Sequence, residues 1–267
     1  MDLGIAGKVA VVAGGSKGIG RAAALELARN GCKLVIAART QKNIDEVVDL
    51  IRAEGGQAVG IATDLLQLDN YAKVLHASEQ AFGAPDIAIQ SIDGPKSGSF
   101  HDLREEDFAE AFHLSVLTFS RFVRTVIPHM KQQRWGRVVL IGSGAVKQPV
   151  RSTLNFSYAL TNTVRIAAVG LQKTLASELA PFGITINTVA TGVIDTEQRA
   201  GFFKDRAADL GMSEEAWSQA FLSMIPMGRY GKPEEEASLA VYLCSQRAGY
   251  TTGETILCDG GFVQSMF

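Results

Sequence analysis

A short apolar run, three spaced glycines and a helical pattern follow one another near the start of this chain. Val9–Ala13 has the β-branched composition of a buried strand, and an Ala/Leu-rich stretch follows Gly20. Gly14 permits a tight turn, Gly18 lets backbone N–H groups approach a ligand, and Gly20 lets helix and strand pack closely. A helix N-terminus adds partial positive charge. This order predicts a site for the pyrophosphate of a dinucleotide, the alternative being a glycine-rich turn that only packs.

Composition excludes several other classes. The 267 residues carry 26 basic and 28 acidic side chains, so neither nucleic acid nor a membrane surface is an expected partner. The three cysteines are too widely spaced for a disulfide framework or a zinc site, which makes a reducing cytoplasm the expected location. We find no signal peptide and no apolar run of transmembrane length, and we expect no metal.

Strand and helix patterns alternate along the chain. The expected strands are Lys8–Ala13, Lys33–Ala38, Ala58–Ala62, Asp86–Gln90, Arg137–Ile141, Thr185–Ala190 and Glu254–Cys258. The expected helices are Gly18–Asn30, Lys42–Glu54, Leu68–Phe82, Glu105–Lys131, Asn155–Ala180 and Pro233–Ser245. Val/Ile-rich strands separated by helices predict an α/β fold with a parallel sheet covered on both faces. Such sheets bind ligands at the carboxyl ends of their strands.

Motifs along nearly the whole chain resemble those of the short-chain dehydrogenase/reductase family. Residues 13–20 match the family's TGxxxGIG loop, with Ala13 in place of threonine. Residues 183–192 match its sixth strand and PG turn, with Thr191 in place of proline. Residues 229–235 and 259–261 match its C-terminal signature. The resemblance implies one Rossmann-type domain over 1–267, a doubly wound parallel sheet of about seven strands, with 192–228 as a segment that covers the substrate.

The resemblance also implies a set of cofactor-binding positions. Asp64 falls where the family's aspartate meets adenine, and Thr196 where a threonine holds the carboxamide of nicotinamide. The full expected set is Gly14, Ser16, Lys17, Gly18, Ile19, Gly20, Arg39, Thr40, Asp64, Leu65, Arg165, Val193 and Thr196.

The choice of cofactor depends on the end of the second strand. A carboxylate there would hold the ribose 2′-hydroxyl of NAD, whereas an arginine accommodates a 2′-phosphate. Arg39 stands at this place, and Lys17 in the glycine loop adds a second cation. We therefore expect NADP(H), the alternative being two solvated surface cations.

The expected reaction centre departs from the family pattern of a serine, an asparagine and Tyr-x-x-x-Lys. Ser143 stands where the serine is expected. Counting back from the later half of the long helix places Thr161 at the tyrosine position and Arg165 at the lysine position. A second register begins at Tyr158 but needs three extra residues inside a buried helix; neither register contains the lysine. Ser115 replaces the asparagine, and Gln90–Asp93 replaces Asn-Asn-Ala-Gly.

Two residues could take over proton transfer from the missing tyrosine. Tyr158, Thr161 and Arg165 share one helical face, so Tyr158 is a candidate general acid with Ser143 as carbonyl donor and Arg165 as the cation that holds ribose. Tyr158 could instead pack or cap the helix start. Asp93 could act as a base if burial raised its pKa, although an Asp before Gly-Pro is more typical of a turn. The four histidines have no ligand spacing and are expected to pack or face solvent.

The covering segment is apolar. Its large side chains are Phe202, Phe203, Met212, Trp217, Phe221, Leu222 and Met224. They favour a lipophilic small-molecule substrate and exclusion of water, unless they form core or subunit contacts. The family resemblance implies a homotetramer or dimer, for which the apolar face of Phe108, Phe112, Phe119, Phe122 and Val126 is suitable, as it is for packing on the sheet.

Two function classes remain. The first is an NADP(H)-dependent oxidoreductase that acts on a carbonyl/alcohol pair with an atypical proton donor, because the cofactor-binding residues are in place. The second is a non-redox descendant, such as a lyase, isomerase or cyclase, or a cofactor-binding sensor, because the usual tyrosine and lysine are missing. We favour the oxidoreductase.

Overall fold

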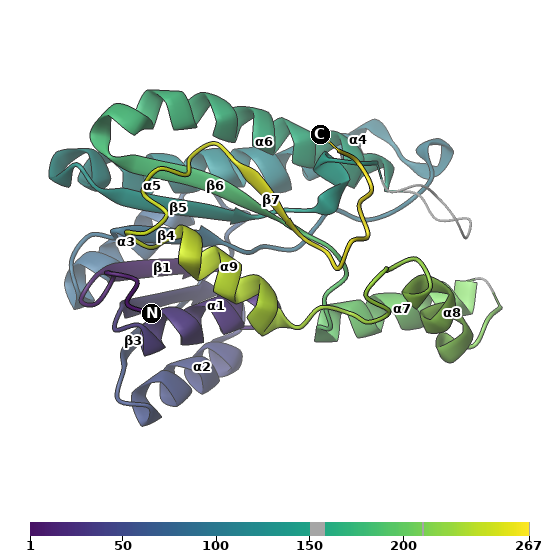
Figure 1. Cartoon of the computed structure of the whole chain (residues 1–267), viewed down its shortest axis with the longest axis horizontal. Helices are drawn as coiled ribbons and strands as arrows, with labels where there is room; N and C mark the ends of the chain where they lie inside the picture. The colour runs from purple at the N-terminus through teal and green to yellow at the C-terminus, as the bar shows by residue number, and fades with distance from the viewer. Residues whose placement is uncertain (150–157, 210, 267) are drawn as a thin grey trace.

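The computed structural model describes residues 1–149, 158–209 and 211–266. Its centre is a seven-stranded sheet in the order β3-β2-β1-β4-β5-β6-β7, and all the strand pairs are parallel (Figure 1). The strands are β1 (Val9–Ala13), β2 (Lys33–Ala38), β3 (Gln57–Ala62), β4 (Ile87–Gln90), β5 (Gly136–Ile141), β6 (Ile184–Thr191) and β7 (Thr255–Cys258). Each expected strand agrees with an observed one to within a residue at either end.

Helices cover both faces of the sheet. They are α1 (Gly18–Arg29), α2 (Gln41–Ala53), α3 (Asn70–Ala81), α4 (Glu105–Phe112), α5 (Thr118–Gln133), α6 (Ala159–Leu179), α7 (Glu197–Asp209), α8 (Glu214–Leu222) and α9 (Pro233–Leu243). Alternate side chains of the central strands point to opposite faces, so Ala10 and Val12 pack with α1, α2 and α9, whereas Val11 and Ala13 pack with α3, α5 and α6. The fold class expected from the sequence is thereby confirmed.

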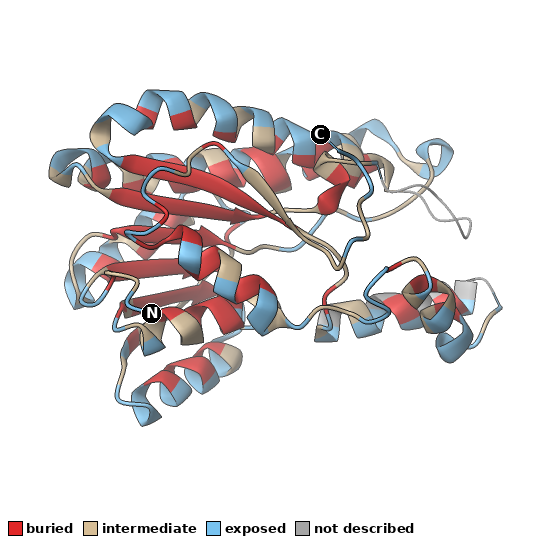
Figure 2. Ribbon diagram, in the orientation of Figure 1, coloured by how far each residue is buried: buried red, intermediate tan, exposed pale blue. Residues whose placement is uncertain are grey.

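The burial pattern places two separate cores on the sheet. Figure 2 shows the strands of the sheet centre buried along their length and the helices buried on one side only. Val and Ile make up most of both strand faces, as a parallel sheet covered by helices requires. Figure 1 shows α7 and α8 to the right, beyond the sheet, rather than on either face.

The predicted helix Glu105–Lys131 is not continuous. A π-helical turn, η2 (His113–Leu117), separates α4 from α5. Such turns are rare overall, and those that occur often lie at functional sites. The apolar periodicity does not reveal the break, because Phe119, Phe122 and Val126 of α5 are buried against the sheet and continue the pattern of α4.

Candidate functional site

The glycine loop lies at the switch point of the sheet, between β2 and β4. The Gly14 N–H donates to the Ala37 carbonyl at 2.7 Å, and the Ser91 N–H donates to the Ala13 carbonyl at 2.8 Å. Gly14 has a φ of +81°, and a Cβ there would collide with the backbone oxygen of Ser91. No other residue type fits this turn, as the sequence predicted.

Helix α1 starts directly from this loop. Its N-cap is Lys17, whose side chain makes no capping hydrogen bond, so the first-turn N–H groups are not occupied by that side chain. Ser16 and Ile19 are half-buried at the loop, and Gly20 is buried. A Cβ on Gly20 would collide with the Gly14 carbonyl, which explains the close packing of helix and loop. Backbone N–H groups and the helix dipole can together bind an anionic phosphate here.

Both cations expected to bind a 2′-phosphate are exposed and paired with carboxylates. The Arg39 Nη2 lies 2.8 Å from Oδ2 of Asp93, and the Lys17 Nζ lies 2.8 Å from Oε2 of Glu197. Thr40 caps α2 by position and its side chain makes no capping bond. Neither carboxylate was predicted as a partner, because the pairs join segments far apart in sequence.

The other expected cofactor positions lie at the same edge. Asp64 is half-buried after β3, where its Oδ1 accepts from the Leu66 N–H at 3.0 Å, and Leu65 is buried. The Val193 carbonyl accepts from the Gly231 N–H at 3.0 Å. Thr196 lies against the glycine loop, since its Cγ2 would be 3.3 Å from a Cβ on Gly18.

The part of this edge where the expected reaction centre lies is called the reaction side. There α6 packs against both η2 and η3 (Gly144–Val146), which brings the expected residues of these three elements to one region. Ser143 follows β5 as the N-cap of η3, and its Oγ accepts from the Ala145 N–H at 3.2 Å. Ser115 in η2 is buried, and its hydroxyl has no hydrogen-bond partner among the described residues. An unsatisfied buried hydroxyl is costly and is frequently explained by a ligand or water.

The α6 residues occupy the start of the helix. Tyr158 is the half-buried N-cap of α6 and forms a parallel bridge with Gly98, while Thr161 and Arg165 are buried. The helix runs from Ala159 to Leu179 without a break. The expected start at Asn155 lies outside the described residues.

Arg165 is a buried charge with incomplete hydrogen bonding among the described residues. Its side chain is 7% exposed, its Nη2 makes only a long 3.4 Å hydrogen bond to the Asp93 carbonyl, and its Nε has no partner in the described part of the chain. Burial lowers the pKa of Arg165 to about 10. A buried guanidinium with few acceptors is unfavourable, so this position fits a ligand that presents oxygen atoms, such as a ribose.

Sequence reasoning missed one buried carboxyl group at this edge. Glu236 of α9 is fully buried; its Oε1 accepts from the Thr191 hydroxyl at 3.0 Å, and Oε2 has no partner in the described segments. Burial raises its pKa to about 7, despite hydrogen bonds from Thr191 and Cys258. Its place in an acidic first turn is typical of a solvated residue, so no sequence signal could have revealed it.

The aromatic residues of the covering segment form a small core of their own. Phe203, Trp217 and Phe221 are buried, and Met212, Met224, Tyr230 and Phe262 pack against them. The ring centroids of Phe203 and Trp217 are 6.1 Å apart in an edge-on contact. The side chain of Phe202 lies outside the described residues. These apolar groups therefore serve to hold α7 and α8 together.

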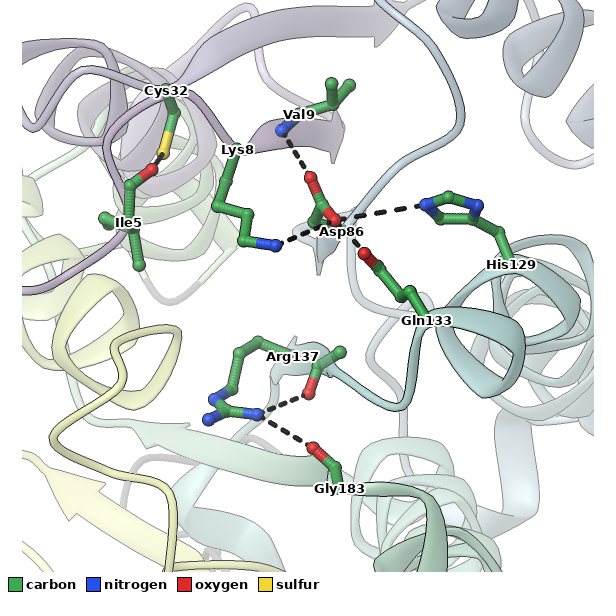
Figure 3. Close-up of polar contacts among 10 residues, drawn as sticks. Ile5, Lys8, Val9, Cys32, Asp86, His129, Gln133, Arg137 and Gly183 are labelled. Carbon is green, nitrogen blue, oxygen red and sulfur yellow. Dashed lines mark hydrogen bonds and ion pairs between the residues drawn. The ribbon is translucent and has the colours of Figure 1, made fainter.

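A second polar cluster lies at the opposite, amino edge of the sheet (Figure 3). The Asp86 carboxylate accepts from the Val9 N–H at 2.9 Å and from Gln133 Nε2 at 2.6 Å, and it lies 3.9 Å from His129 Nε2.

His113 is 2.6 Å from the Leu66 carbonyl. Among the described residues no group of His, Cys, Asp and Glu could hold a metal ion, and no helix is both long and apolar enough to cross a bilayer.

Comparison with known proteins identifies the family. Residues 13–263 match the model of the enoyl-(acyl carrier protein) reductase family. The chain is 31% identical over 258 residues to dehydrogenase/reductase SDR family member 4 of Oryctolagus cuniculus, which covers 96% of this chain and 94% of the relative. It is also 31% identical over 261 residues to the NADPH-dependent reductase BacG of Bacillus subtilis, with coverage of 97% and 99%.

A solved structure agrees with these relatives. The L-sorbose reductase of Gluconobacter frateurii, complexed with NADPH and L-sorbose, superposes with a TM-score of 0.91 at 28% identity, and the match covers 100% of both chains. On the sequence matches and the shared fold together, this chain belongs to the short-chain dehydrogenase/reductase family of oxidoreductases.

Proposed function

We propose that this chain is an NADPH-dependent reductase that converts a carbonyl group of a small molecule to an alcohol. The observation that carries the proposal is Arg165, a buried guanidinium whose Nε lacks a partner among the described residues at the strand ends. A cation in this position is explained by a cofactor ribose that accepts its hydrogen bonds. Two of the similar proteins are described as NADPH-dependent or NADPH-bound, which supports the choice of cofactor.

In this proposal, the cofactor lies along the carboxyl edge. The glycine loop and the first turn of α1 bind the pyrophosphate, Arg39 and Lys17 bind the 2′-phosphate, and Asp64 and Leu65 border the adenine. Arg165 holds the nicotinamide ribose, and Val193 and Thr196 bind the carboxamide. Gly14 and Gly20 allow the close packing of the loop, because a side chain at either position would collide with neighbouring backbone atoms.

NADPH held by these residues would supply a hydride for the carbonyl carbon, and the residues of the chain must polarise the carbonyl and deliver a proton to its oxygen. The Ser143 Oγ already accepts from the Ala145 N–H, which leaves its own hydrogen to donate to the substrate oxygen. Ser115 provides a second hydroxyl, which has no hydrogen-bond partner among the described residues. The C–H and O–H bonds of the alcohol would form as the carbonyl π bond, the C–H bond of the hydride donor and the O–H bond of the proton donor break.

We assign the proton donor to Tyr158. Its phenol carries a proton that it can donate, and a cation on the same helical face stabilises the tyrosinate that it leaves behind. Arg165 lies on that face, seven residues later, but as a permanently charged group it does not pass the proton itself. The Thr161 hydroxyl, at the position counted for the usual tyrosine, is too weak an acid for this role.

The substrate and its enclosure also belong to the proposal. We assign 192–228 as the lid, with α7 and α8 as its helices, within a single domain of residues 1–267. The apolar substrate stays a prediction, and its main support is weakened because Phe203, Trp217 and Phe221 are occupied in packing with one another. Cytoplasmic location also stays a prediction.

The assembly as a tetramer or dimer is a further prediction. Of the apolar face expected to pair, Phe119, Phe122 and Val126 are buried against the sheet, whereas Phe112 is 44% exposed. Ile166 on α6 is 54% exposed as well. Light scattering coupled to gel filtration checks the mass.

The direct test is NADPH consumption, followed at 340 nm, with a panel of ketones, β-keto thioesters, quinones and ketoses. We expect turnover with at least one class and loss of about 10²-fold in kcat for Ser143→Ala. Ser99→Ala, an exposed hydroxyl that pairs with Asp102, is the matched control and should retain activity. Tight NADPH binding without any turnover would favour the non-redox alternative.

A further inference from the structure

Each of the two cations assigned to the 2′-phosphate already has an anionic partner within the chain. Arg39 follows β2 and pairs with Asp93, which follows β4; Lys17 in the glycine loop pairs with Glu197, the first residue of α7. Both N–O distances are 2.8 Å. Two carboxylates from separate segments therefore occupy the cations that a phosphate group would need.

These ion pairs are weak enough to be exchanged. The side chains of Arg39 and Asp93 are 69% and 51% exposed, and those of Lys17 and Glu197 are 58% and 77% exposed. Exposed ion pairs contribute little to stability, because water and salt screen their charges. A phosphate monoester carries up to two negative charges and several acceptor oxygens, so it is the stronger partner for both cations.

One contact beside each carboxylate keeps its segment near the paired cation. The Asp93 carbonyl accepts the hydrogen bond from Arg165, which ties the loop after β4 to α6. Thr196, directly before Glu197, lies against Gly18 of the glycine loop. These contacts hold the backbone near each cation, while either exposed carboxylate can leave its cation by rotation of its own side chain.

We propose that Asp93 and Glu197 set the cofactor selectivity of this enzyme by competing with the 2′-phosphate of NADPH for Arg39 and Lys17. The inference rests on the proposed function, namely NADPH bound at this edge. NADH lacks the 2′-phosphate and does not displace either carboxylate. The two acidic residues therefore reduce the preference for NADPH over NADH below what Arg39 and Lys17 alone would give.

The test is a fluorescence titration of the whole protein with NADPH and with NADH at low ionic strength. The variants are Asp93→Asn, Glu197→Gln and the double substitution, and the readout is the ratio of the NADH Kd to the NADPH Kd. Using a ratio removes the general attraction that loss of any negative charge gives to both cofactors. We expect the ratio to rise about two- to five-fold for each single variant, more for the double, and to return towards the wild-type value in high salt.

Glu54→Gln is the matched control, because Glu54 forms an equally exposed pair with Arg29 at the end of α1, far from the cofactor edge. It should leave the ratio unchanged. A ratio that stays constant or falls in both Asp93→Asn and Glu197→Gln overturns the competition. A fall would mean that the carboxylates hold the cations in place for the phosphate.

Arg39→Gln separates this failure from failure of the proposed function. If wild type binds NADPH and Arg39→Gln weakens NADPH but not NADH, the phosphate site stands and the variants above decide the competition. If wild type does not bind NADPH, or Arg39→Gln changes nothing, the proposed cofactor site itself is wrong and the competition falls with it.

Discussion

The two sides of the carboxyl edge satisfy their polar groups in opposite ways. On the cofactor side, Arg39 and Lys17 are exposed and each is paired with a carboxylate. On the reaction side, Ser115 and Arg165 are buried. The Ser115 hydroxyl and the Arg165 Nε have no hydrogen-bond partner within the described residues. Exposed pairs exchange partners at little cost, whereas buried unsatisfied groups lower stability until a ligand binds them. In the proposed function, ligand affinity on the cofactor side can therefore be changed through the ion pairs, whereas the reaction side favours a ligand that satisfies its buried groups.

The largest expected effect comes from the backbone of the cofactor side. Gly14→Ala combines a φ of +81° with a collision against the Ser91 carbonyl, so we expect a loss of about 3 kcal/mol in the free energy of unfolding and no measurable NADPH binding. Gly55→Ala is the control, because Gly55 has a φ of +83° but nothing within 4 Å of its Cβ. It should cost about 1 kcal/mol and leave binding intact; equal costs in urea denaturation would contradict the account.

A buried arginine on each edge of the sheet tests the reaction side. Arg165→Met should remove an unpaired charge and stabilise the apo protein by about 1–3 kcal/mol, while kcat/KM falls at least about 10²-fold. Arg137→Met is the contrast, since the Arg137 guanidinium donates to the carbonyls of Ser245, Gly136 and Gly183 and its loss should destabilise by several kcal/mol. If Arg165→Met destabilises as much as Arg137→Met in thermal unfolding, Arg165 is a structural residue.

The fold was more predictable than the site, for reasons visible in particular residues. The strand Val9–Ala13 and the glycines after it are specified by local composition, so the β1–α1 unit follows directly from the sequence. The π-turn around Ser115 does not, because apolar spacing tolerates one extra residue in a helix. The Lys17–Glu197 pair joins residues 180 positions apart, and no local pattern reports such a contact.

The sequence also does not reveal that a carboxyl group is buried. For Glu236, this burial predicts that the free energy of unfolding depends on pH. Its pKa rises from 4.5 to about 7 on folding, so the folded state holds this proton more tightly than the unfolded chain. This contribution to stability is fully present below pH 4.5 and is lost as the pH rises through 7. We expect wild type to lose about 3 kcal/mol by pH 8 through this group.

The comparison is urea denaturation of wild type and Glu236→Gln at pH 5 and pH 8. The variant should lack this part of the pH dependence. Glu235→Gln is the control on the same helix turn, because Arg229 lowers the pKa of Glu235 and its contribution is lost only as the pH falls. If wild type and Glu236→Gln change in parallel between pH 5 and 8, Glu236 is not protonated in the folded state.

The smallest effect is expected for Ser115. Ser115→Ala removes a hydroxyl that is unsatisfied within the described structure, so the free energy of unfolding should stay within about 1 kcal/mol of wild type. A lowered kcat at unchanged stability would place this hydroxyl against the substrate. A large loss of stability would instead indicate a buried water that Ser115 holds.

The central claim is that the reaction side is built around Tyr158 and Arg165 rather than around the position of Thr161. The most direct measurement is the kcat for NADPH-dependent reduction of one accepted ketone by Tyr158→Phe and by Thr161→Val, with the NADPH Kd of each. We predict a loss of about 10²-fold or more in kcat for Tyr158→Phe, little change for Thr161→Val, and an unchanged Kd in both. Full turnover by Tyr158→Phe with loss in Thr161→Val would contradict the account.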